Sequence, residues 1–187
     1  MPLPIITTER LILRSFTLKD APELARAINA PEIATNTLNI TYPYEEQMAV
    51  DWISSLEERY VSGVNVNFAI TLRSTGEIGG SVGLVINQRH QHAEMGYWLA
   101  VALWGQGYIT EAARACLDFG FETLSLHRIH AGHYARNPAS GRVMQKLGMT
   151  YEGTFRHHYL KDGVFEDNVV YGILRDEWER QKSKSNG

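Results

Sequence analysis

The sequence has few of the features that mark specialised protein classes. Its single cysteine, Cys116, cannot form an internal disulfide, which suits a reducing compartment. No apolar run approaches the ~18 residues of a membrane span. The first residues show no basic stretch followed by an apolar core, so we expect neither a membrane anchor nor a secretory signal. The net charge of −3 disfavours nucleic acid as a partner, because polyanion binders are usually basic. Together these absences predict a cytoplasmic protein.

What remains is the composition of an ordinary globular domain. The chain has 187 residues, of which 44% are hydrophobic and 21% are charged. A chain of this length can bury a core that needs no disulfide or metal for stability. We therefore expect a single domain over residues 1–187, with a core at about residues 5–178 and a frayed, polar tail after Trp178.

Hydrophobic periodicity predicts a mixed α/β fold. Apolar, β-rich runs indicate strands at residues 10–16, 66–70, 78–86, 93–101, 129–136, 149–156 and 164–174. Spacings of three and four predict helices over residues 20–30, 44–62, 109–120 and 138–147. Asp20 is expected to cap the first helix with Glu23 in the capping box, and Pro31 to end or interrupt it. The element order describes a mixed sheet with helices on its faces.

The segment WGQGYITEA, at residues 104–112, joins a predicted strand to a predicted helix. Its two glycines let a ligand approach the backbone closely, and a helix start offers unpaired N–H groups to a phosphate. A nucleotide-binding P-loop would need a Gly-Lys-Ser/Thr ending, which is absent. A dinucleotide fingerprint would need a third glycine where Thr110 stands. A tight turn without any ligand is the simplest alternative.

Several motifs in order resemble one family. They are EMGYWL at 94–99, the WGQGY loop with TEA at 110–112, NPAS at 137–140, and KLGM at 146–149 with EG at 152–153. The opening TERLILR at 8–14 and GGSVG at 79–83 fit the same pattern. Together they resemble the GNAT acetyltransferases, in the branch of the RimJ/RimL-type ribosomal-protein N-terminal acetyltransferases. The resemblance covers roughly residues 5–178.

The resemblance implies where the co-substrate acetyl-CoA binds. Strands 93–101 and 129–136 would splay apart, with helices on both faces of the sheet, and acetyl-CoA would lie in the wedge. Pantetheine would pair with the backbone of Leu99, Ala100 and Val101, and the pyrophosphate would contact N–H groups of the glycine loop. The family's usual Gln or Arg is Ala102 here, which leaves the backbone donors in place. The remaining expected contacts are Leu103, Trp104, Gly105, Gln106, Gly107, Tyr108, Thr110, Asn137 and Ser140.

Two side chains are candidates for catalysis. Glu94 could accept the proton of the amine, directly or through water, or it could be a solvated or paired carboxylate. Ser140 could donate to the departing thiolate, because Met144 replaces the tyrosine that many GNAT enzymes use, or it could simply lie in the first turn of a helix. Asn137 is both a candidate N-cap and a candidate pantetheine contact. The branch carries a further acid near Tyr159, and tyrosine is a poor base at neutral pH.

The resulting prediction is an acetyl-CoA-dependent N-acetyltransferase that acts on a primary amine by direct attack in a ternary complex. A peptide or protein N-terminal α-amine is favoured by resemblance only. Alternatives are a small-molecule amine, a non-catalytic acyl-CoA-binding protein and a nicotinamide-binding protein. No metal is expected, because His130 and His133 would face opposite sides of a strand. GNAT proteins are often homodimers, and nothing in the sequence fixes an interface.

Overall fold

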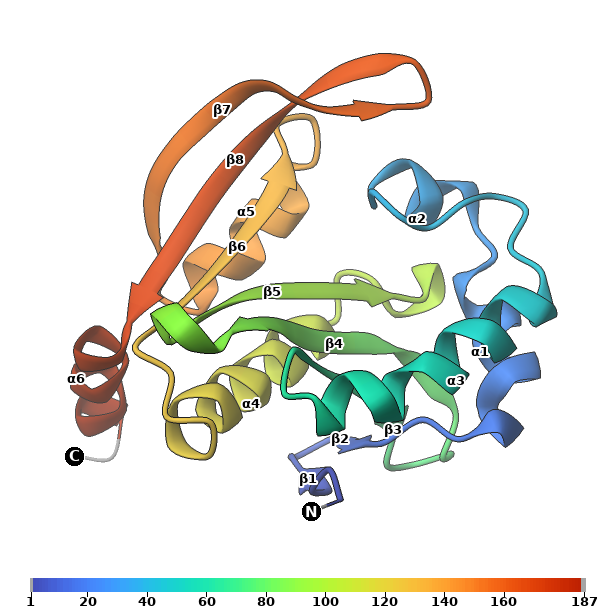
Figure 1. Ribbon diagram of the computed structural model, residues 1–187, viewed down its shortest axis with the longest axis horizontal. Helices are drawn as coiled ribbons and strands as arrows, with labels where there is room; N and C mark the ends of the chain where they lie inside the picture. Colours follow the sequence, from blue (N-terminus) through green and yellow to red (C-terminus); the bar gives the residue numbers. More distant parts are fainter. Residues whose placement is uncertain (1, 186–187) are drawn as a thin grey trace.

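A computed structural model describes residues 2–185, which are built around one eight-stranded sheet in the order β1-β2-β3-β4-β5-β6-β8-β7. The strands are β1 (Ile6–Thr7), β2 (Leu11–Arg14), β3 (Asn65–Leu72), β4 (Ile78–Asn87), β5 (His92–Leu99), β6 (Arg128–Tyr134), β7 (Thr150–Lys161) and β8 (Val164–Leu174). The helices are α1 (Ala21–Ile28), α2 (Pro31–Thr35), α3 (Glu46–Val61), α4 (Tyr108–Glu122), α5 (Pro138–Lys146) and α6 (Arg175–Ser185). Figure 1 shows the arrangement.

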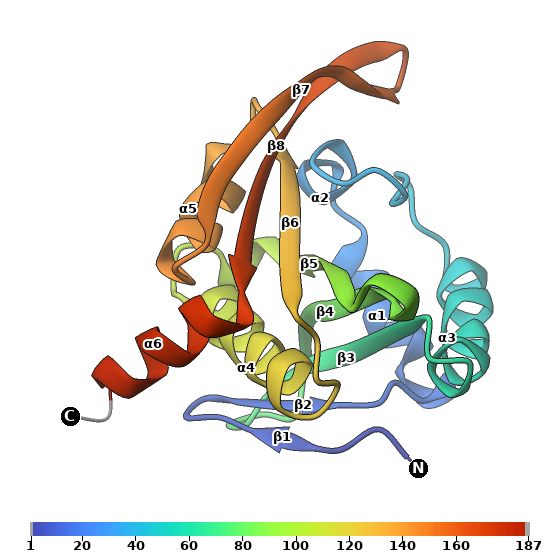
Figure 2. The same ribbon diagram turned by 60° about the vertical axis from the view of Figure 1, so that its left-hand side comes forward.

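Helices cover both faces of the sheet, as the sequence predicts. Helices α1 and α3 contact each other and lie on β3 and β4, whereas α4 and α5 lie on the opposite side (Figure 2). The main core fills the space between α4 and the sheet, where Phe119 packs edge-to-face on Phe68 with ring centroids 5.3 Å apart. Apolar burial of this kind is what stabilises a mixed sheet with helices on its faces.

The two central strands separate after a short stretch of pairing. Strand β5 runs parallel to β6, and the register pairs His92 with Arg128, Ala93 with Ile129 and Glu94 with His130. Beyond this point the strands diverge, and β6 continues alongside β8 (Figure 1). The predicted splay is confirmed, and Glu94 is the last residue of β5 to pair before the wedge opens.

The end of β5 differs from the prediction. The strand stops at Leu99 rather than at residue 101, and Val101–Leu103 forms a 3-10 turn. Turn hydrogen bonds account for this, since Leu103 N donates to the Ala100 carbonyl at 2.9 Å and Trp104 N donates to the Val101 carbonyl at 3.1 Å. The prediction for residues 129–136 is also shifted, because β6 spans Arg128–Tyr134.

Asp20 is the N-cap residue of α1, as predicted, but the predicted capping hydrogen bonds are absent. The Asp20 side chain makes no capping bond to α1; it accepts from Thr17 N at 2.7 Å and pairs with the Arg14 guanidinium at 2.8 and 2.9 Å. The Glu23 carboxylate accepts instead from Ile78 N at 2.9 Å and so ties α1 to β4. Pro31 lies after the end of α1 and begins α2.

The C-terminal segment was predicted to be frayed, but Arg175–Ser185 forms α6. Trp178 holds this polar helix to α4, because its ring stacks on Phe121 at 5.1 Å and its Nε1 donates to Asp118 at 2.7 Å. Residues 186–187 of the predicted tail lie outside the described residues. None of the helices within residues 2–185 has the length and apolar character that crossing a membrane requires.

Candidate active site

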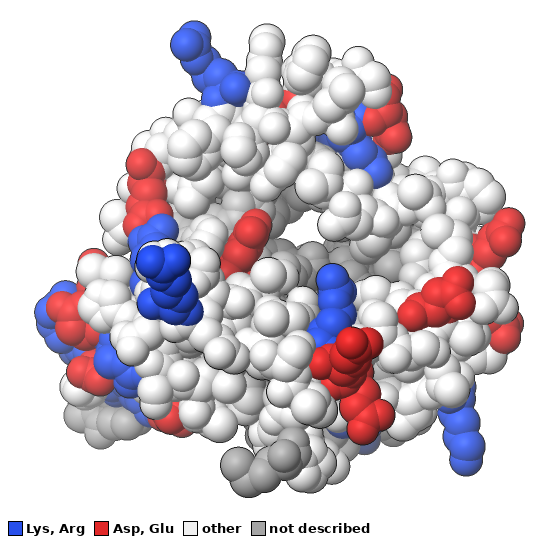
Figure 3. Space-filling view, viewed as in Figure 1, with Lys and Arg blue, Asp and Glu red and all other residues white. Residues whose placement is uncertain are grey.

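A cleft of about 760 Å³ opens where β5 and β6 separate. Figure 3 shows a hollow near the centre of this face of the molecule. Both candidate catalytic residues, Glu94 and Ser140, line the cleft. So do many of the predicted cofactor contacts, namely Leu99, Leu103, Trp104, Gly105, Gly107, Thr110 and Asn137. The structure thus brings together residues from β5, α4, α5 and the loops before these helices.

The glycine loop gives the cleft an exposed backbone wall. Gly105 and Gly107 have φ angles of +75° and +83°, which residues with a side chain rarely adopt. A Cβ at Gly105 would meet no described atom within 4 Å, so the backbone faces open space. Gly107 is the N-cap residue of α4, whose first N–H groups and dipole favour an anion. This arrangement fits a phosphate group.

A partly exposed ion pair connects the start of α4 to the segment before β2. The Glu111 carboxylate accepts from Arg10 Nε at 2.7 Å, from Arg10 N at 2.8 Å and from Thr8 Oγ1 at 2.6 Å. Burial favours the protonated form of Glu111, but the hydrogen bonds from Thr8 and Arg10 lower its pKa below the ordinary value. Arg10 also donates to the Gln106 carbonyl at 2.9 Å and covers the Tyr108 ring at 4.3 Å. Gln106 and Tyr108 were predicted as cofactor contacts, and neither lines the cleft.

The backbone expected to pair with pantetheine already has partners in the protein. The Leu99 carbonyl accepts from the Trp104 indole Nε1 at 2.8 Å, and Ala100 N donates to the Gly79 carbonyl at 2.8 Å. The Ala100 and Val101 carbonyls accept from the turn that follows, and neither residue lines the cleft. A strand-like pairing with Leu99, Ala100 and Val101 therefore stays a prediction, in which these carbonyls would accept a second hydrogen bond beside the one they already have.

Glu94 lies at the apex of the wedge with two titratable neighbours. Burial lowers the pKa of His130, although the Glu94 charge raises it. Burial, and then the charge of Glu94, raises the pKa of Tyr159, so this phenol keeps its proton at neutral pH. Gly96 lies on the same face of β5, two residues along, and a Cβ there would meet nothing within 4 Å. The Glu94 carboxylate therefore adjoins open space.

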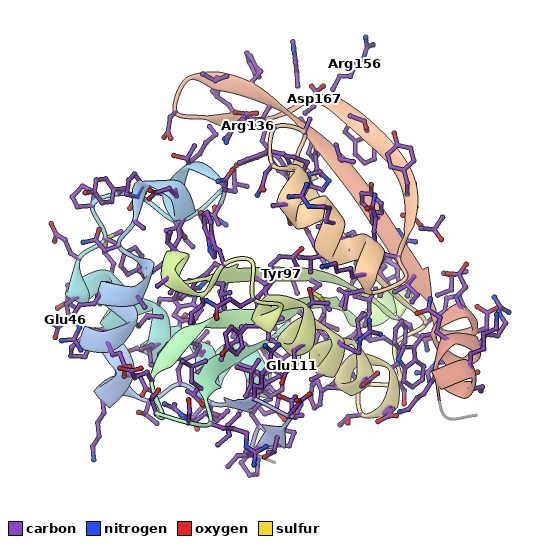
Figure 4. The ribbon with its side chains drawn as sticks, turned by 180° about the vertical axis from the view of Figure 1, so that it is seen from behind. Glu46, Tyr97, Glu111, Arg136, Arg156 and Asp167 are labelled. Atoms are coloured by element: carbon purple, nitrogen blue, oxygen red, sulfur yellow. The ribbon has the colours of Figure 1, made fainter. Side chains whose placement is uncertain are left out.

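Ser140 lies on the other side of β5, in the first turn of α5, and contacts a residue that sequence reasoning missed. The Tyr97 hydroxyl is 2.9 Å from Ser140 Oγ and donates to the Ser140 carbonyl at 3.2 Å. Burial raises the pKa of Tyr97 to about 12, although the bond to Ser140 acts in the opposite direction. Figure 4 shows Tyr97 near the centre of the molecule, between α4 and α5. Asn137 occupies the N-cap position without a capping bond from its side chain, and it lines the cleft.

Comparison with known proteins decides the family. A family model described as an acetyltransferase (GNAT) domain matches residues 10–150. The chain belongs to the GNAT acetyltransferases.

Individual relatives agree with this assignment. An uncharacterized N-acetyltransferase, p20 from Bacillus licheniformis, is 33% identical over 172 residues, covering 91% of this chain and 96% of its own. The putative ribosomal N-acetyltransferase YdaF from Bacillus subtilis (strain 168) is 29% identical over 182 residues, covering 93% and 96%. A crystal structure of a GNAT-family acetyltransferase from Bacillus anthracis superimposes with a TM-score of 0.83 at 26% identity, covering 93% of this chain and 100% of the other. GNAT enzymes use acetyl-CoA, and the glycine loop at α4 fits its pyrophosphate.

In this GNAT chain, two cationic side chains connect the walls of the cleft at the end away from the glycine loop. Lys161, whose side chain is 8% exposed, donates to the Ile40 carbonyl at 3.0 Å and to the Leu38 carbonyl at 3.4 Å. Arg136 donates to the Thr35 carbonyl at 2.7 Å and pairs with Glu166 at 2.6 Å. These bonds tie α2 and the segment after it to β7 and the end of β6. The walls here combine apolar side chains, namely Ile33, Leu38, Ile40, Tyr44 and Trp52, with polar ones that include Asn36, Thr37 and Asn39.

The structure also shows the surroundings of Cys116 and of the histidines that the sequence analysis considered. Cys116 is fully buried, and burial raises the pKa of its thiol to about 12, which rules out a thiolate nucleophile at neutral pH. His130 faces His92, with ring centroids 5.6 Å apart, whereas His133 stacks on Tyr171 at 6.0 Å. Within residues 2–185, no group of three or more His, Cys, Asp and Glu side chains could hold a metal ion.

Proposed function

We propose that this protein transfers the acetyl group of acetyl-CoA to a primary amine within a ternary complex. One observation carries the proposal: the wedge between β5 and β6 opens a single cleft that joins the glycine loop of α4 to Glu94 and Ser140. A co-substrate bound along this cleft and an amine bound beside Glu94 would meet without a covalent enzyme intermediate. Holding both reactants in one site supplies much of the acceleration of such a reaction.

In this proposal acetyl-CoA lies along the cleft and along the backbone segments next to it. Its pyrophosphate binds the N–H groups between Leu103 and Tyr108 at the start of α4, and Thr110 lies in the first turn beside them. Its pantetheine arm runs past Leu99, Ala100 and Val101, with the Asn137 amide as a further contact. The free Asn137 side chain supports this role, because it makes no capping bond that would compete.

Glu94 and Ser140 would then act from opposite faces of β5, Glu94 on the amine and Ser140 on the sulfur. Glu94 removes one proton from the ammonium, directly or through water, and the amine nitrogen attacks the thioester carbonyl carbon. The carbon–sulfur bond breaks, the nitrogen loses a second proton, and the sulfur leaves as a thiolate that ends as the thiol. Ser140 donates a hydrogen bond to that sulfur. Tyr159, with its raised pKa, does not replace Glu94 as the base.

We propose a peptide or protein N-terminal α-amine as the acceptor. Relatives such as YdaF, named as a putative ribosomal N-acetyltransferase, support this class. An α-amine has a pKa near 7.7–8.0, so a carboxylate base needs little driving force. The lining of the cleft supports it too, because Glu32 and Glu94 are the only carboxylates among its described residues. A polyamine with several charges would favour more acidic walls.

The test is acetyl transfer measured by mass spectrometry. The protein is incubated with acetyl-CoA and either short peptides with a free α-amine or spermidine. Acetylation of the peptide α-amine at a higher kcat/KM than of spermidine supports the proposal. Transfer to spermidine alone would favour the small-amine alternative, and binding of acetyl-CoA without transfer to any amine would favour an acyl-CoA-binding protein.

We also propose that residues 1–187 form a single domain, with a core at about residues 5–178, that works in the cytoplasm. One continuous eight-stranded sheet supports the first statement, and the single buried cysteine is compatible with the second. A homodimer stays a prediction from the family resemblance, and size-exclusion chromatography with light scattering would test it.

A further inference from the structure

A tyrosine on β5 contacts Ser140 from inside the wedge. Its hydroxyl lies 2.9 Å from Ser140 Oγ and 3.2 Å from the Ser140 carbonyl oxygen. Tyr97 itself lines the cleft beside Ser140. Because the hydroxyls of tyrosine and serine can both donate and accept, the shorter contact can run in either direction. The direction decides whether the Ser140 hydrogen is available to a ligand.

The surroundings of Tyr97 favour one direction. Its phenol carries one hydrogen, and burial raises its pKa to about 12, so it stays protonated over the pH range of ordinary assays. The Ser140 carbonyl can only accept, so the contact at 3.2 Å requires the phenol hydrogen to point toward Ser140. Ser140 Oγ lies closer still, at 2.9 Å, so one hydrogen of Tyr97 can be shared between the two oxygens of Ser140.

We propose that Tyr97 is a positioning residue for Ser140: its one hydrogen is shared between Ser140 Oγ and the Ser140 carbonyl, which leaves the Ser140 hydrogen to point toward the leaving sulfur of CoA. This inference rests on the proposed function, in which Ser140 donates to that sulfur. It adds a second hydroxyl to the site and gives the sequence motif EMGYWL two roles, one on each face of β5.

No proton needs to leave either hydroxyl in this arrangement. A thiol has a pKa of about 8.5, well below that of Tyr97 at about 12, so the thiolate does not deprotonate the pair. The proton that ends on sulfur comes from the amine, which loses two protons on becoming an amide. Ser140 and Tyr97 stabilise the charge on sulfur by a chain of two hydrogen bonds while the carbon–sulfur bond breaks.

Tyr171 provides a matched control. Its hydroxyl accepts from Gln145 Nε2 at 3.1 Å, so it also braces α5 from the sheet, and it does not line the cleft. Removing either hydroxyl takes away polar contact with α5, at Ser140 for Tyr97 and at Gln145 for Tyr171. Only Tyr97 contacts Ser140 in this way, so a difference between Tyr97→Phe and Tyr171→Phe separates positioning from bracing.

The experiment compares kcat for the wild type, Tyr97→Phe, Ser140→Ala, the double variant and Tyr171→Phe. CoA release is followed with saturating acetyl-CoA and a short peptide that has a free α-amine. We expect kcat to fall roughly 3- to 10-fold for Tyr97→Phe and roughly 10- to 100-fold for Ser140→Ala. The double variant should match Ser140→Ala within about 2-fold, because Tyr97 acts through Ser140. The KM for acetyl-CoA should stay within about 2-fold throughout, and Tyr171→Phe should keep wild-type kcat.

Different results overturn different statements. If Ser140→Ala is slow but Tyr97→Phe is as fast as wild type, the positioning role fails and the proposed function stands. The positioning role also fails if the double variant loses the product of the two single effects, or if Tyr171→Phe is as slow as Tyr97→Phe. If Ser140→Ala keeps wild-type kcat, or if the wild type acetylates no amine, the proposed chemistry fails and this inference fails with it.

Discussion

Individual side chains divide the cleft between the two faces of β5. Tyr97 faces α5, and Glu94, three residues earlier, lies on the opposite face of β5, because side chains alternate between the two faces of a strand. The sequence motifs placed Glu94 and Ser140 in one site by resemblance, and both line the same cleft. Tyr97 could not be selected, because its contact with Ser140 joins residues 43 positions apart. Arg10 was missed for the same reason, since Glu111 lies 101 positions away.

The first prediction concerns Glu94 as the base. Glu94→Gln should lower kcat by about 100-fold and flatten the rise of the rate with pH, because an amide cannot accept the proton. The rise in thermal midpoint produced by acetyl-CoA should stay unchanged. Glu57→Gln, an exposed change on α3 outside the cleft, is the control. Wild-type turnover in Glu94→Gln would remove Glu94 from the mechanism.

At the scale of elements, hydrophobic periodicity predicted most strands and the longer helices. It failed where tertiary contacts decide the structure. Helix α6 is polar around its surface, and contacts of Trp178 with Phe121 and Asp118 hold it in place. Strand β1 has two residues, which is too short for any alternation to be visible. The end of β5 was predicted two residues too far along, because a 3-10 turn of apolar residues resembles a strand in sequence.

The second prediction concerns the brace beneath α4. Glu111→Gln should destabilise the protein by about 1–2 kcal/mol at pH 7, because charged hydrogen bonds from Arg10 and Thr8 are weakened. The pKa of Glu111 is lowered in the folded state from an ordinary value of 4.5, so its contribution is present above about pH 4.5 and is lost as the pH falls through the folded pKa. Urea unfolding at several pH values measures this. A difference between wild type and variant that grows on acidification would contradict the prediction.

At the scale of the whole molecule, the side chains of Lys161 and Arg136 connect the two sides of the wedge, since both donate to carbonyls of α2 or of the segment after it. Lys161→Met removes the donor to the Leu38 and Ile40 carbonyls. We expect a stability loss of about 1–3 kcal/mol and faster hydrogen exchange over residues 36–42, because these two carbonyls lose a charged hydrogen-bond donor. Exchange in α4 should not change. The control is Lys19→Met at an exposed position, and equal exchange in both variants would show that Lys161 does not hold this segment.

Binding of acetyl-CoA in the wedge is the central claim, and the thermal midpoint of unfolding tests it most directly. The protein is heated with acetyl-CoA, CoA, NADH or ATP, each at millimolar concentration. A ligand at 100 times its Kd stabilises the native state by about 2.7 kcal/mol, which corresponds to a rise of roughly 5–10 °C for a chain of this size. We predict that acetyl-CoA and CoA each raise the midpoint by this amount and that NADH and ATP do not. No shift with either form of CoA would contradict the proposed site and the mechanism built on it.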